Sequence, residues 1–352
     1  MDDQNMAHDP LMAGLVPRKK VVSQKEQAAL KLSMGAFEKA AHLFGQVTLY
    51  YNTSSEMLKK SLYYRHMCED AYYFGRMVKA QTSFTEIEAR LYDLEKEDYR
   101  AKPHEDPAPH STQLTHVAHL YMAARYARNW YRREPQPSEF AGLYDVMVPL
   151  AVNQGIMTRE SIIDGFKSKN VEKFFQAPAL GWNLATACSN WIRHQDKFLY
   201  NPISEMVWLT MLPALVAKTG MVPYPALSFG GSFSFETYIH RPSFEEKMLY
   251  LAGVLERTAL KSREKVTKSA MRVEGWTHIL KDKRVKSKQI YEMLPWLTVR
   301  ERFLVRDVEL LLDAPRATAA RMVDTLVKAN IVGFEVRHNR NKIYHTQRLS
   351  SL

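Results

Sequence analysis

The chain has 352 residues, of which 46% are hydrophobic and 25% are charged, and it carries 49 Lys and Arg residues against 38 Asp and Glu residues. These fractions are those of a folded globular protein and exclude a wholly disordered or fibrous chain. The length is typical of about two domains. The longest strongly apolar stretch, residues 206–217, is shorter than the roughly 20 residues that a membrane helix needs, so we expect no membrane contact.

The start of the chain is acidic and lacks the charged-then-apolar pattern of a secretory signal. The two cysteines, Cys68 and Cys188, lie far apart in the sequence and have no metal-ligand spacing. We therefore expect two reduced thiols and a cytoplasmic protein.

Residues 1–24 are expected to form a flexible tail. From Lys25 onward, apolar residues recur mostly at spacings of three and four, which predicts a helix. A proline-rich loop is predicted at residues 101–112. No alternating strand pattern precedes residue 330, so residues 25–255 are predicted to form one helical domain. The later helices of this domain are predicted over residues 55–80, 85–99, 114–133, 139–153, 159–168 and 171–192.

Pairs of tyrosines occur at residues 50–51, 63–64 and 72–73. Aromatic rings can stack on nucleic-acid bases. The helical spacing of these tyrosines favours packing in the core and between helices instead.

Positive charge is concentrated towards the end of the chain. Residues 245–276 are predicted to form a long helix that is apolar at first and increasingly basic, and residues 256–286 to connect the two domains. Residues 281–352 hold 15 Lys and Arg residues against 8 Asp and Glu residues. This excess favours a polyanionic partner, because contacts to phosphates release counterions. A basic surface that only maintains solubility is the alternative.

Residues 287–352 have the pattern of three short helices followed by a hairpin. A turn is predicted at residues 313–315, and the turn of the hairpin, residues 337–342, is polar and largely basic. The helices and strands are expected, in chain order, over residues 287–297, 305–312, 316–329, 331–336 and 343–346. This order is typical of a winged helix-turn-helix. Its third helix enters the major groove, and its hairpin contacts phosphates or the minor groove.

Residues 311–332, LLDAPRATAARMVDTLVKANIV, resemble the winged helix of bacterial regulators and of the C-terminus of Fic-family proteins. The resemblance implies that this segment binds double-stranded DNA. The candidates for contacts to base edges or nearby phosphates are Arg316, Thr318 and Arg321 on the predicted third helix. The candidates for positioning and secondary contacts follow them: Lys328, Arg337, His338, Asn339, Arg340, Asn341 and Lys342.

A second resemblance covers residues 207–230, VWLTMLPALVAKTGMVPYPALSFG, which are similar to the helix that follows the active-site loop of the Fic family. Residues 241–266 are similar to the later helices of that fold. The resemblance implies a Fic-like helical domain.

The family's active-site motif, HPFxDGNGR, supplies a His base, phosphate-binding Asn and Gly groups and a charge-neutralising Arg. The resemblance places this loop at residues 198–206, FLYNPISEM. Phe198, Ser204 and Met206 then stand at the His, Asn and Arg positions. The resemblance therefore implies a domain that has lost its catalytic motif, and we expect no enzymatic activity.

No cofactor or metal is expected, because the sequence has no phosphate-binding loop, dinucleotide-binding, HExxH or CxxC motif. The paired glycines Gly230-Gly231 favour a tight turn over an anion nest. The expected fold class is mainly α, a degenerate Fic-like helical domain followed by a winged helix-turn-helix.

The favoured function is that of a bacterial, plasmid or phage transcriptional regulator. Its winged helix would read DNA, and its helical domain would form a homodimer or bind an effector or a protein partner. A divergent Fic-type nucleotidyl transferase and a protein-interaction adaptor are the alternatives.

Overall fold

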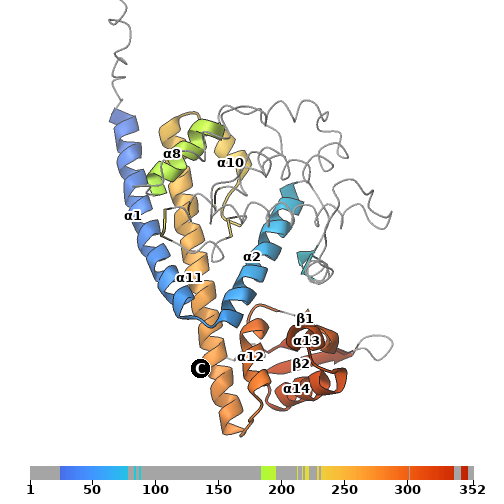
Figure 1. Ribbon diagram of the computed structural model, residues 1–352. Coiled ribbons are helices and arrows are strands. Elements are labelled where there is room, and N and C mark those ends of the chain that lie inside the picture. The colour runs from blue at the N-terminus through green and yellow to red at the C-terminus, as the bar shows by residue number, and fades with distance from the viewer. Residues whose placement is uncertain are drawn as a thin grey trace, which may run out of the picture.

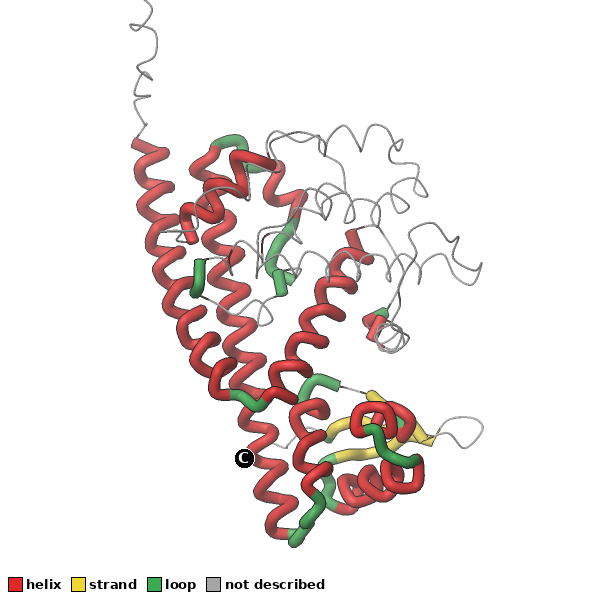
Figure 2. Tube along the Cα trace, viewed as in Figure 1, coloured by secondary structure: helices red, strands yellow, loops and turns green. Residues whose placement is uncertain are grey.

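The computed structural model describes residues 24–77, 184–195, 231–300, 302–336 and 342–347, with residues 83, 84, 87, 88, 212, 216, 219–221, 228 and 229 between them. These residues are mainly helical, and their strands lie together in the C-terminal part of the chain (Figure 2). The elements, in chain order, are α1 (Gln24–Thr53), α2 (Glu56–Met77), α8 (Leu184–Gln195), α10 (Phe235–Ile239), α11 (Phe244–Asp282), α12 (Lys288–Leu297), β1 (Arg302–Phe303), α13 (Val305–Leu312), α14 (Arg316–Lys328), β2 (Val332–Val336) and β3 (Lys342–Thr346).

The two longest of these helices, α1 and α11, run side by side along the molecule (Figure 1). Lys39 of α1 lies 3.6 Å from Glu256 of α11. Two turns further along α1, Gln46 accepts a hydrogen bond of 3.1 Å from Arg263. Both contacts advance in the same direction on the two helices, so α1 and α11 are parallel. Each helix buries small and apolar side chains along its length, among them Ala40, Phe44, Val47, Ala252, Leu255 and Ala259.

Helix α2 turns back from the end of α1 and rises beside α11, with its lower end next to α12 (Figure 1). Lys265 of α11 donates hydrogen bonds of 2.7 and 2.5 Å to the two carboxylate oxygens of Glu69 on α2. At its other end α2 contacts α12. This helix therefore connects the helical body, formed by α1, α2 and α11, to the elements that follow α11.

Helices α12 to α14 and the three strands form the C-terminal unit, residues 288–347, which has its own hydrophobic core. The rings of Trp296 and Phe303 meet edge to face with centroids 5.3 Å apart, and Phe303 stacks on Tyr344 at 5.7 Å. Trp276 and Leu280, in the last turns of α11, belong to the same buried cluster. The long helix α11 is therefore shared between the helical body and the C-terminal unit.

The sheet of the C-terminal unit is antiparallel, with strand order β1-β3-β2. Its central strand β3 pairs Tyr344 with Phe303 on one side and with Phe334 on the other. Aromatic residues directly opposite one another stabilise such a sheet. The hairpin is thereby anchored to the two-residue strand β1 as well as to α14, which contacts β2.

Among the described residues, the prediction of a mainly helical fold is confirmed. The helices predicted from residue 287 onward correspond to α12, α13 and α14, and the predicted hairpin corresponds to β2 and β3. One strand, β1, precedes the predicted hairpin and was not among the elements expected from the sequence. Strand β1 contains only Arg302 and Phe303, too few residues to show an alternating pattern, and pairing with the distant strand β3 holds it in place.

Helix α11 extends beyond the predicted end at residue 276 and passes unbroken through residue 255, where the helical domain was expected to end. Gln24, the last residue of the expected tail, is the first residue of α1. The rest of that tail and the helices predicted over residues 114–133, 139–153 and 159–168 lie outside the described residues.

A buried arginine after α12 joins the C-terminal unit to the helical body. The side chain of Arg300 is 4% exposed, and it donates hydrogen bonds to the Tyr64 hydroxyl at 3.1 Å and the Glu88 carbonyl at 3.4 Å. Its guanidinium nitrogens also lie 3.7 Å from a carboxylate oxygen of Glu88 and 4.0 Å from one of Asp307. Burial opposes the charge, but the facing tyrosine and the two carboxylates outweigh it and raise the pKa of Arg300 above its ordinary value.

Both cysteines are free and buried, Cys68 in α2 and Cys188 in α8. Burial raises the pKa of both thiols well above the ordinary value. Because the thiolate is the reactive form, we expect neither cysteine of the native protein to react with a thiol-specific reagent such as DTNB. Both should react once guanidinium chloride unfolds the chain, as measured by absorbance. Rapid labelling of one thiol in the native protein would contradict this arrangement.

Candidate nucleic-acid interface

The turn between α13 and α14 sets the direction in which α14 leaves α13. Asp313 adopts the left-handed conformation at φ 47°, and the N–H that follows it donates to the Glu309 carbonyl at 3.0 Å, which ends α13. A short polar side chain tolerates this conformation better than most. Pro315 is then extended, and its carbonyl accepts the N–H of Thr318 at 2.8 Å, which starts α14. The predicted turn at residues 313–315 is where these conformations occur.

Helix α14 has a buried face and an exposed face that carries two cations, Arg321 and Lys328, and one carboxylate, Asp324. Ala319, Val323 and Leu326 are fully buried in the core of the C-terminal unit. Arg321 and Lys328 are exposed and lie seven residues apart, so they share the opposite face. The burial of the apolar face therefore directs these cations to solvent.

The two arginines of this helix make weak local contacts. Arg316 Nε lies 3.8 Å from a carboxylate oxygen of Glu309, and the Arg316 side chain is 86% exposed. An ion pair this exposed contributes little to stability. Arg321 Nε donates a hydrogen bond of 3.2 Å to the carbonyl of Ala317 at an exposed position. Both guanidinium groups remain accessible to a phosphate or a base edge.

Lys283, which sequence reasoning did not include in the site, adds a cation at the end of α14. Its ammonium donates a hydrogen bond of 3.1 Å to the backbone carbonyl of Lys328. A cation is favourable there, because the last carbonyls of a helix carry partial negative charge. Lys283 lies in the loop after α11, and only the fold brings it to α14, so no local pattern could have identified it.

The β2–β3 hairpin places Lys342 beside exposed apolar side chains. Lys342 is opposite Val336 in the ladder, and its Nζ lies 4.6 Å from the centroid of the Phe334 ring. Val336 is 63% exposed and Phe334 is 43% exposed. The other predicted residues of the hairpin turn lie outside the described residues: Arg337, His338, Asn339, Arg340 and Asn341.

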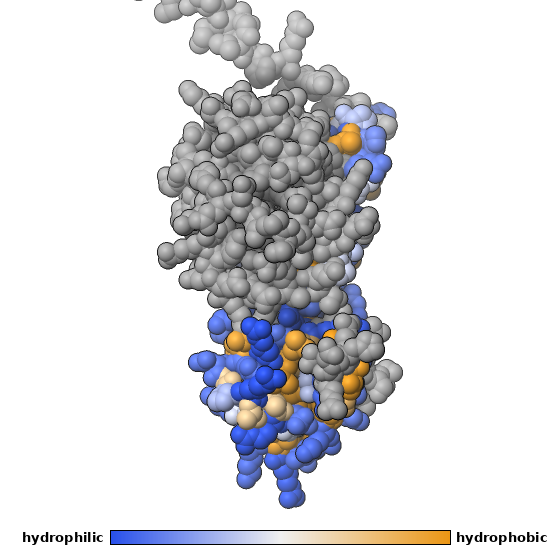
Figure 3. Space-filling model, turned by 90° about the vertical axis from the view of Figure 1, so that its right-hand side faces the viewer, coloured by the Kyte–Doolittle hydropathy of each residue, from blue (hydrophilic) through white to orange (hydrophobic). Residues whose placement is uncertain are grey.

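The structure brings part of the predicted set together. Arg316, Thr318, Arg321 and Lys328 all lie on α14, and Lys342 begins the strand next to β2, which contacts α14. Thr318 is half-buried, and the three basic residues of α14, Arg316, Arg321 and Lys328, are exposed. On the face shown in Figure 3, strongly hydrophilic side chains gather over the C-terminal unit with hydrophobic ones among them.

The positions at which the Fic motif was expected, residues 198–206, lie outside the described residues. In the part of the chain that the structure describes, no group of three or more His, Cys, Asp or Glu side chains could hold a metal ion. Gly231 lies in a turn, which Ser232 closes by donating its N–H to the Phe229 carbonyl at 2.9 Å. None of the described helices is long and apolar enough to cross a membrane.

No protein-family model matches the chain, and no curated protein matches it.

Proposed function

We propose that the C-terminal unit is a winged helix-turn-helix domain that binds double-stranded DNA, and that the chain is a transcriptional regulator. The order of the elements supports this proposal: a helix, a short strand, two helices and a hairpin, with strand order β1-β3-β2. The sharp turn at Asp313 between α13 and α14 fits the short connection of a helix-turn-helix. In this proposal α14 is the helix that enters the major groove.

The observation that carries the proposal is the exposed basic face of α14 beside the hairpin. Arg321 and Lys328 point away from the core that orients α14, and Lys342 stands on the adjacent hairpin. A helix anchored by one face presents its other face as a rigid surface, which a duplex groove can accept. Ala317 is small and exposed, so it allows close approach of the backbone to DNA.

We assign two roles to these residues. Arg316, Thr318 and Arg321 contact base edges or the nearest phosphates, and Arg side chains pair best with guanine. The phosphate contacts that position the protein come from the end of α14 and from the hairpin: Lys328, Arg337, Arg340 and Lys342, with His338, Asn339 and Asn341 secondary. We add Lys283 to this second group, because its ammonium lies at the end of α14 and donates a hydrogen bond to the Lys328 carbonyl.

The helical body would then provide dimerisation or bind an effector or a protein partner, and the protein would act in the cytoplasm of a bacterium. Catalysis has no part in this proposal.

We expect Arg316→Ala to weaken binding to the preferred duplex by about 1–3 kcal/mol and to relax the sequence preference. The preferred duplex is first selected from a random pool, and affinities are then measured by mobility-shift titration. Lys39→Ala is the matched control, because Lys39 is 71% exposed on α1, within the helical body. An Arg316→Ala variant that keeps both the affinity and the preference of the wild type would remove Arg316 from the base-reading set.

We expect Arg340→Ala to act differently, because a phosphate contact carries no sequence information. Binding to all duplexes should weaken by a similar factor, and the slope of log K against log salt should fall by about one. Titration of both variants at two salt concentrations measures this slope. Binding that is insensitive to salt and equal in wild type and variants would contradict the whole assignment.

A protein-interaction role is the second candidate, and exposed apolar side chains on the C-terminal unit favour it. Leu304, Leu310, Phe334 and Val336 are each at least 41% exposed. Such residues are typical of the core of a protein–protein interface. This role would be preferred if the protein binds no duplex from the random pool and instead co-elutes with a protein partner.

A further inference from the structure

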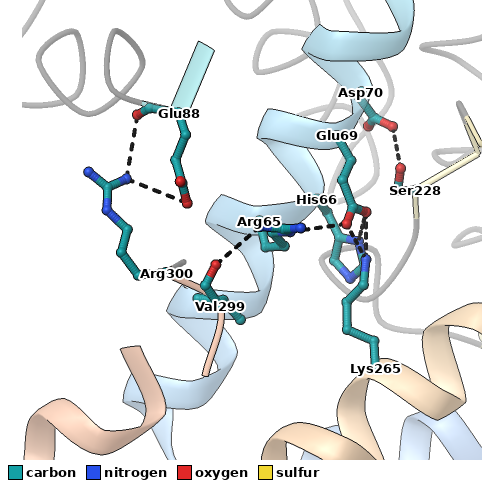
Figure 4. Close-up of polar contacts among 9 residues, drawn as sticks. All are labelled: Arg65, His66, Glu69, Asp70, Glu88, Ser228, Lys265, Val299 and Arg300. Atoms are coloured by element: carbon teal, nitrogen blue, oxygen red, sulfur yellow. Dashed lines mark hydrogen bonds and ion pairs between the residues drawn. The ribbon is translucent and has the colours of Figure 1, made fainter. Parts of the chain in front are cut away.

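A cavity of about 580 Å³ lies between α2 and α11, away from the surface of α14. Side chains from both helices line it, together with Phe84, Ser228 and Gly231. Arg65, His66 and Glu69 of α2 face Lys265 of α11 across this region (Figure 4). A cavity of this volume accommodates a small-molecule ligand.

One wall of the cavity carries a row of ammonium groups. Lys261, Lys265 and Lys268 are spaced by four and three residues on α11, so they lie on one face of the helix. Lys265 is held by Glu69, and Lys268 pairs with Glu264 on its own helix. Lys261 donates a hydrogen bond of 2.5 Å to the Gly231 carbonyl, a neutral acceptor that leaves the ammonium charge uncompensated.

The lining has an excess of positive charge. Among its described residues, the Lys and Arg side chains outnumber the Glu side chains by four to two when His66 is neutral. Glu69 is already engaged: its carboxylate accepts from Arg65 Nε at 3.2 Å as well as from Lys265. Burial raises the pKa of Glu69, but the His66 ring, whose Nδ1 lies 3.5 Å from a Glu69 carboxylate oxygen, and the charge of Lys265 outweigh burial, and the pKa lies below its ordinary value. The Glu69 carboxylate is therefore charged at neutral pH and compensates only part of the positive wall.

Another part of the lining is aromatic. The ring of Tyr72 meets those of Tyr73 and Phe84 edge to face, with centroids 5.5 and 5.9 Å apart. Gly231 closes this side: a Cβ atom there would lie 2.6 Å from the Tyr73 hydroxyl oxygen, so only glycine allows the approach without a shift. Rings arranged in this way offer both faces and edges to a planar ligand.

We propose that this cavity binds a small molecule that carries an anionic group, a phosphate or a carboxylate, and an aromatic ring, and that this ligand is the effector of the C-terminal unit. The anionic group would lie against Lys261 and Lys265, and the ring against Tyr72 and Tyr73. Arg65 can add a charge-assisted hydrogen bond to the anion, because its guanidinium already lies at the cavity wall.

Arg65 also supplies the connection to the C-terminal unit. Its Nη1 donates a hydrogen bond of 3.3 Å to the carbonyl of Val299, the residue before the buried Arg300 (Figure 4). An anion that draws Arg65 towards the cavity weakens this bond, and with it the seating of the C-terminal unit on α2. The effector role rests on the proposed DNA binding, whereas ligand binding by the cavity does not.

The first test is a fluorescence titration of the full chain with 1-anilinonaphthalene-8-sulfonate, a probe that combines a planar aromatic system with an anion. We expect saturable binding that Lys261→Met weakens about tenfold or more, because one charge-assisted contact is lost. Lys268→Met should weaken it less, because the Lys268 ammonium is already paired with Glu264 on its own helix. Lys39→Met is the matched control and should bind the probe as the wild type does.

Competition with the probe then tests the anionic group and the aromatic ring of the ligand separately. Phenyl phosphate and benzoate should displace the probe, and the tighter of the two identifies the anionic group. Inorganic phosphate and phenol should each compete at least tenfold more weakly, because each has only one of the two groups that the cavity is proposed to bind. Equal probe binding by the wild type and both lysine variants, or no saturable binding, would overturn the cavity site.

The second test measures duplex binding with and without the tighter competitor. We expect the dissociation constant for the preferred duplex to change at least threefold in the wild type and to remain unchanged in Lys261→Met. A ligand that binds the cavity and leaves duplex binding unchanged overturns the effector role alone. If the protein binds no duplex at all, the proposed function and the effector role fail together, and the probe titration still decides whether the cavity is a ligand site.

Discussion

Replacing Arg300 by methionine is expected to lower the free energy of unfolding by about 3–5 kcal/mol. The guanidinium is buried at the junction of α2 with the C-terminal unit and is bonded to the Tyr64 hydroxyl and the Glu88 carbonyl. Glu88 is also buried, so removal of the cation leaves its carboxylate without the compensating charge 3.7 Å away. Removing one partner of a buried ion pair is costly for this reason. The loss of stability exceeds the stability that the intact pair contributes.

Urea unfolding followed by tryptophan fluorescence measures the effect. Arg302→Met is the matched control, because Arg302 lies two residues further along the chain and is exposed. This variant should change the stability by less than about 0.5 kcal/mol. A loss below about 1 kcal/mol in Arg300→Met would mean that the junction is solvated in solution.

The position of Arg300 also corrects the interpretation of the charge near the end of the chain. The sequence places Arg300 among the Lys and Arg residues whose excess favours a polyanionic partner. Its side chain is 4% exposed and is engaged inside the molecule, so it contributes nothing to a docking surface. Residue counts treat every cation as exposed, and only the fold distinguishes Arg300 from the exposed Arg316.

Elements with strong local signals were predictable from the sequence. The turn at residues 313–315 combines a residue that tolerates the left-handed conformation with a proline, and the helix after it has a regular apolar face. Helix α14 and its exposed cations follow from these two signals. Strand β1 has no such signal, because its two residues are extended only through pairing with β3.

The cavity between α2 and α11 could not be predicted, because its walls come from segments far apart in the chain. Glu69 and Lys265 are separated by almost 200 residues, and their contact depends on how α2 folds back against α11. The helical spacing of the tyrosines at residues 72–73 predicts packing residues. They are half-buried, and they line the cavity together with Phe84. Helical spacing identifies a residue that faces inward, and it does not distinguish a filled core from a cavity.

Replacing Trp276 by alanine is expected to lower the free energy of unfolding by about 3–5 kcal/mol, because a fully buried aromatic side chain leaves a large cavity. Trp276 is 1% exposed and lies in α11, yet it packs in the core of the C-terminal unit. Trp276→Phe retains much of the packing and should cost less. Met271→Ala is the matched control on the same helix, since Met271 is 65% exposed.

The elements that lose stability in Trp276→Ala test whether α11 is shared between the helical body and the C-terminal unit. If the last turns of α11 belong to the core of the C-terminal unit, Trp276→Ala should accelerate hydrogen exchange in β3 and α14 first. The α1–α11 pair should keep its protection, because it depends on separate contacts near Lys39 and Gln46. Equal acceleration in α1 and in β3 would instead mean that the chain unfolds as one unit. If α11 is shared between two cores, we expect faster exchange in β3 and α14 first, because the cavity left by Trp276→Ala lies only in the core of the C-terminal unit.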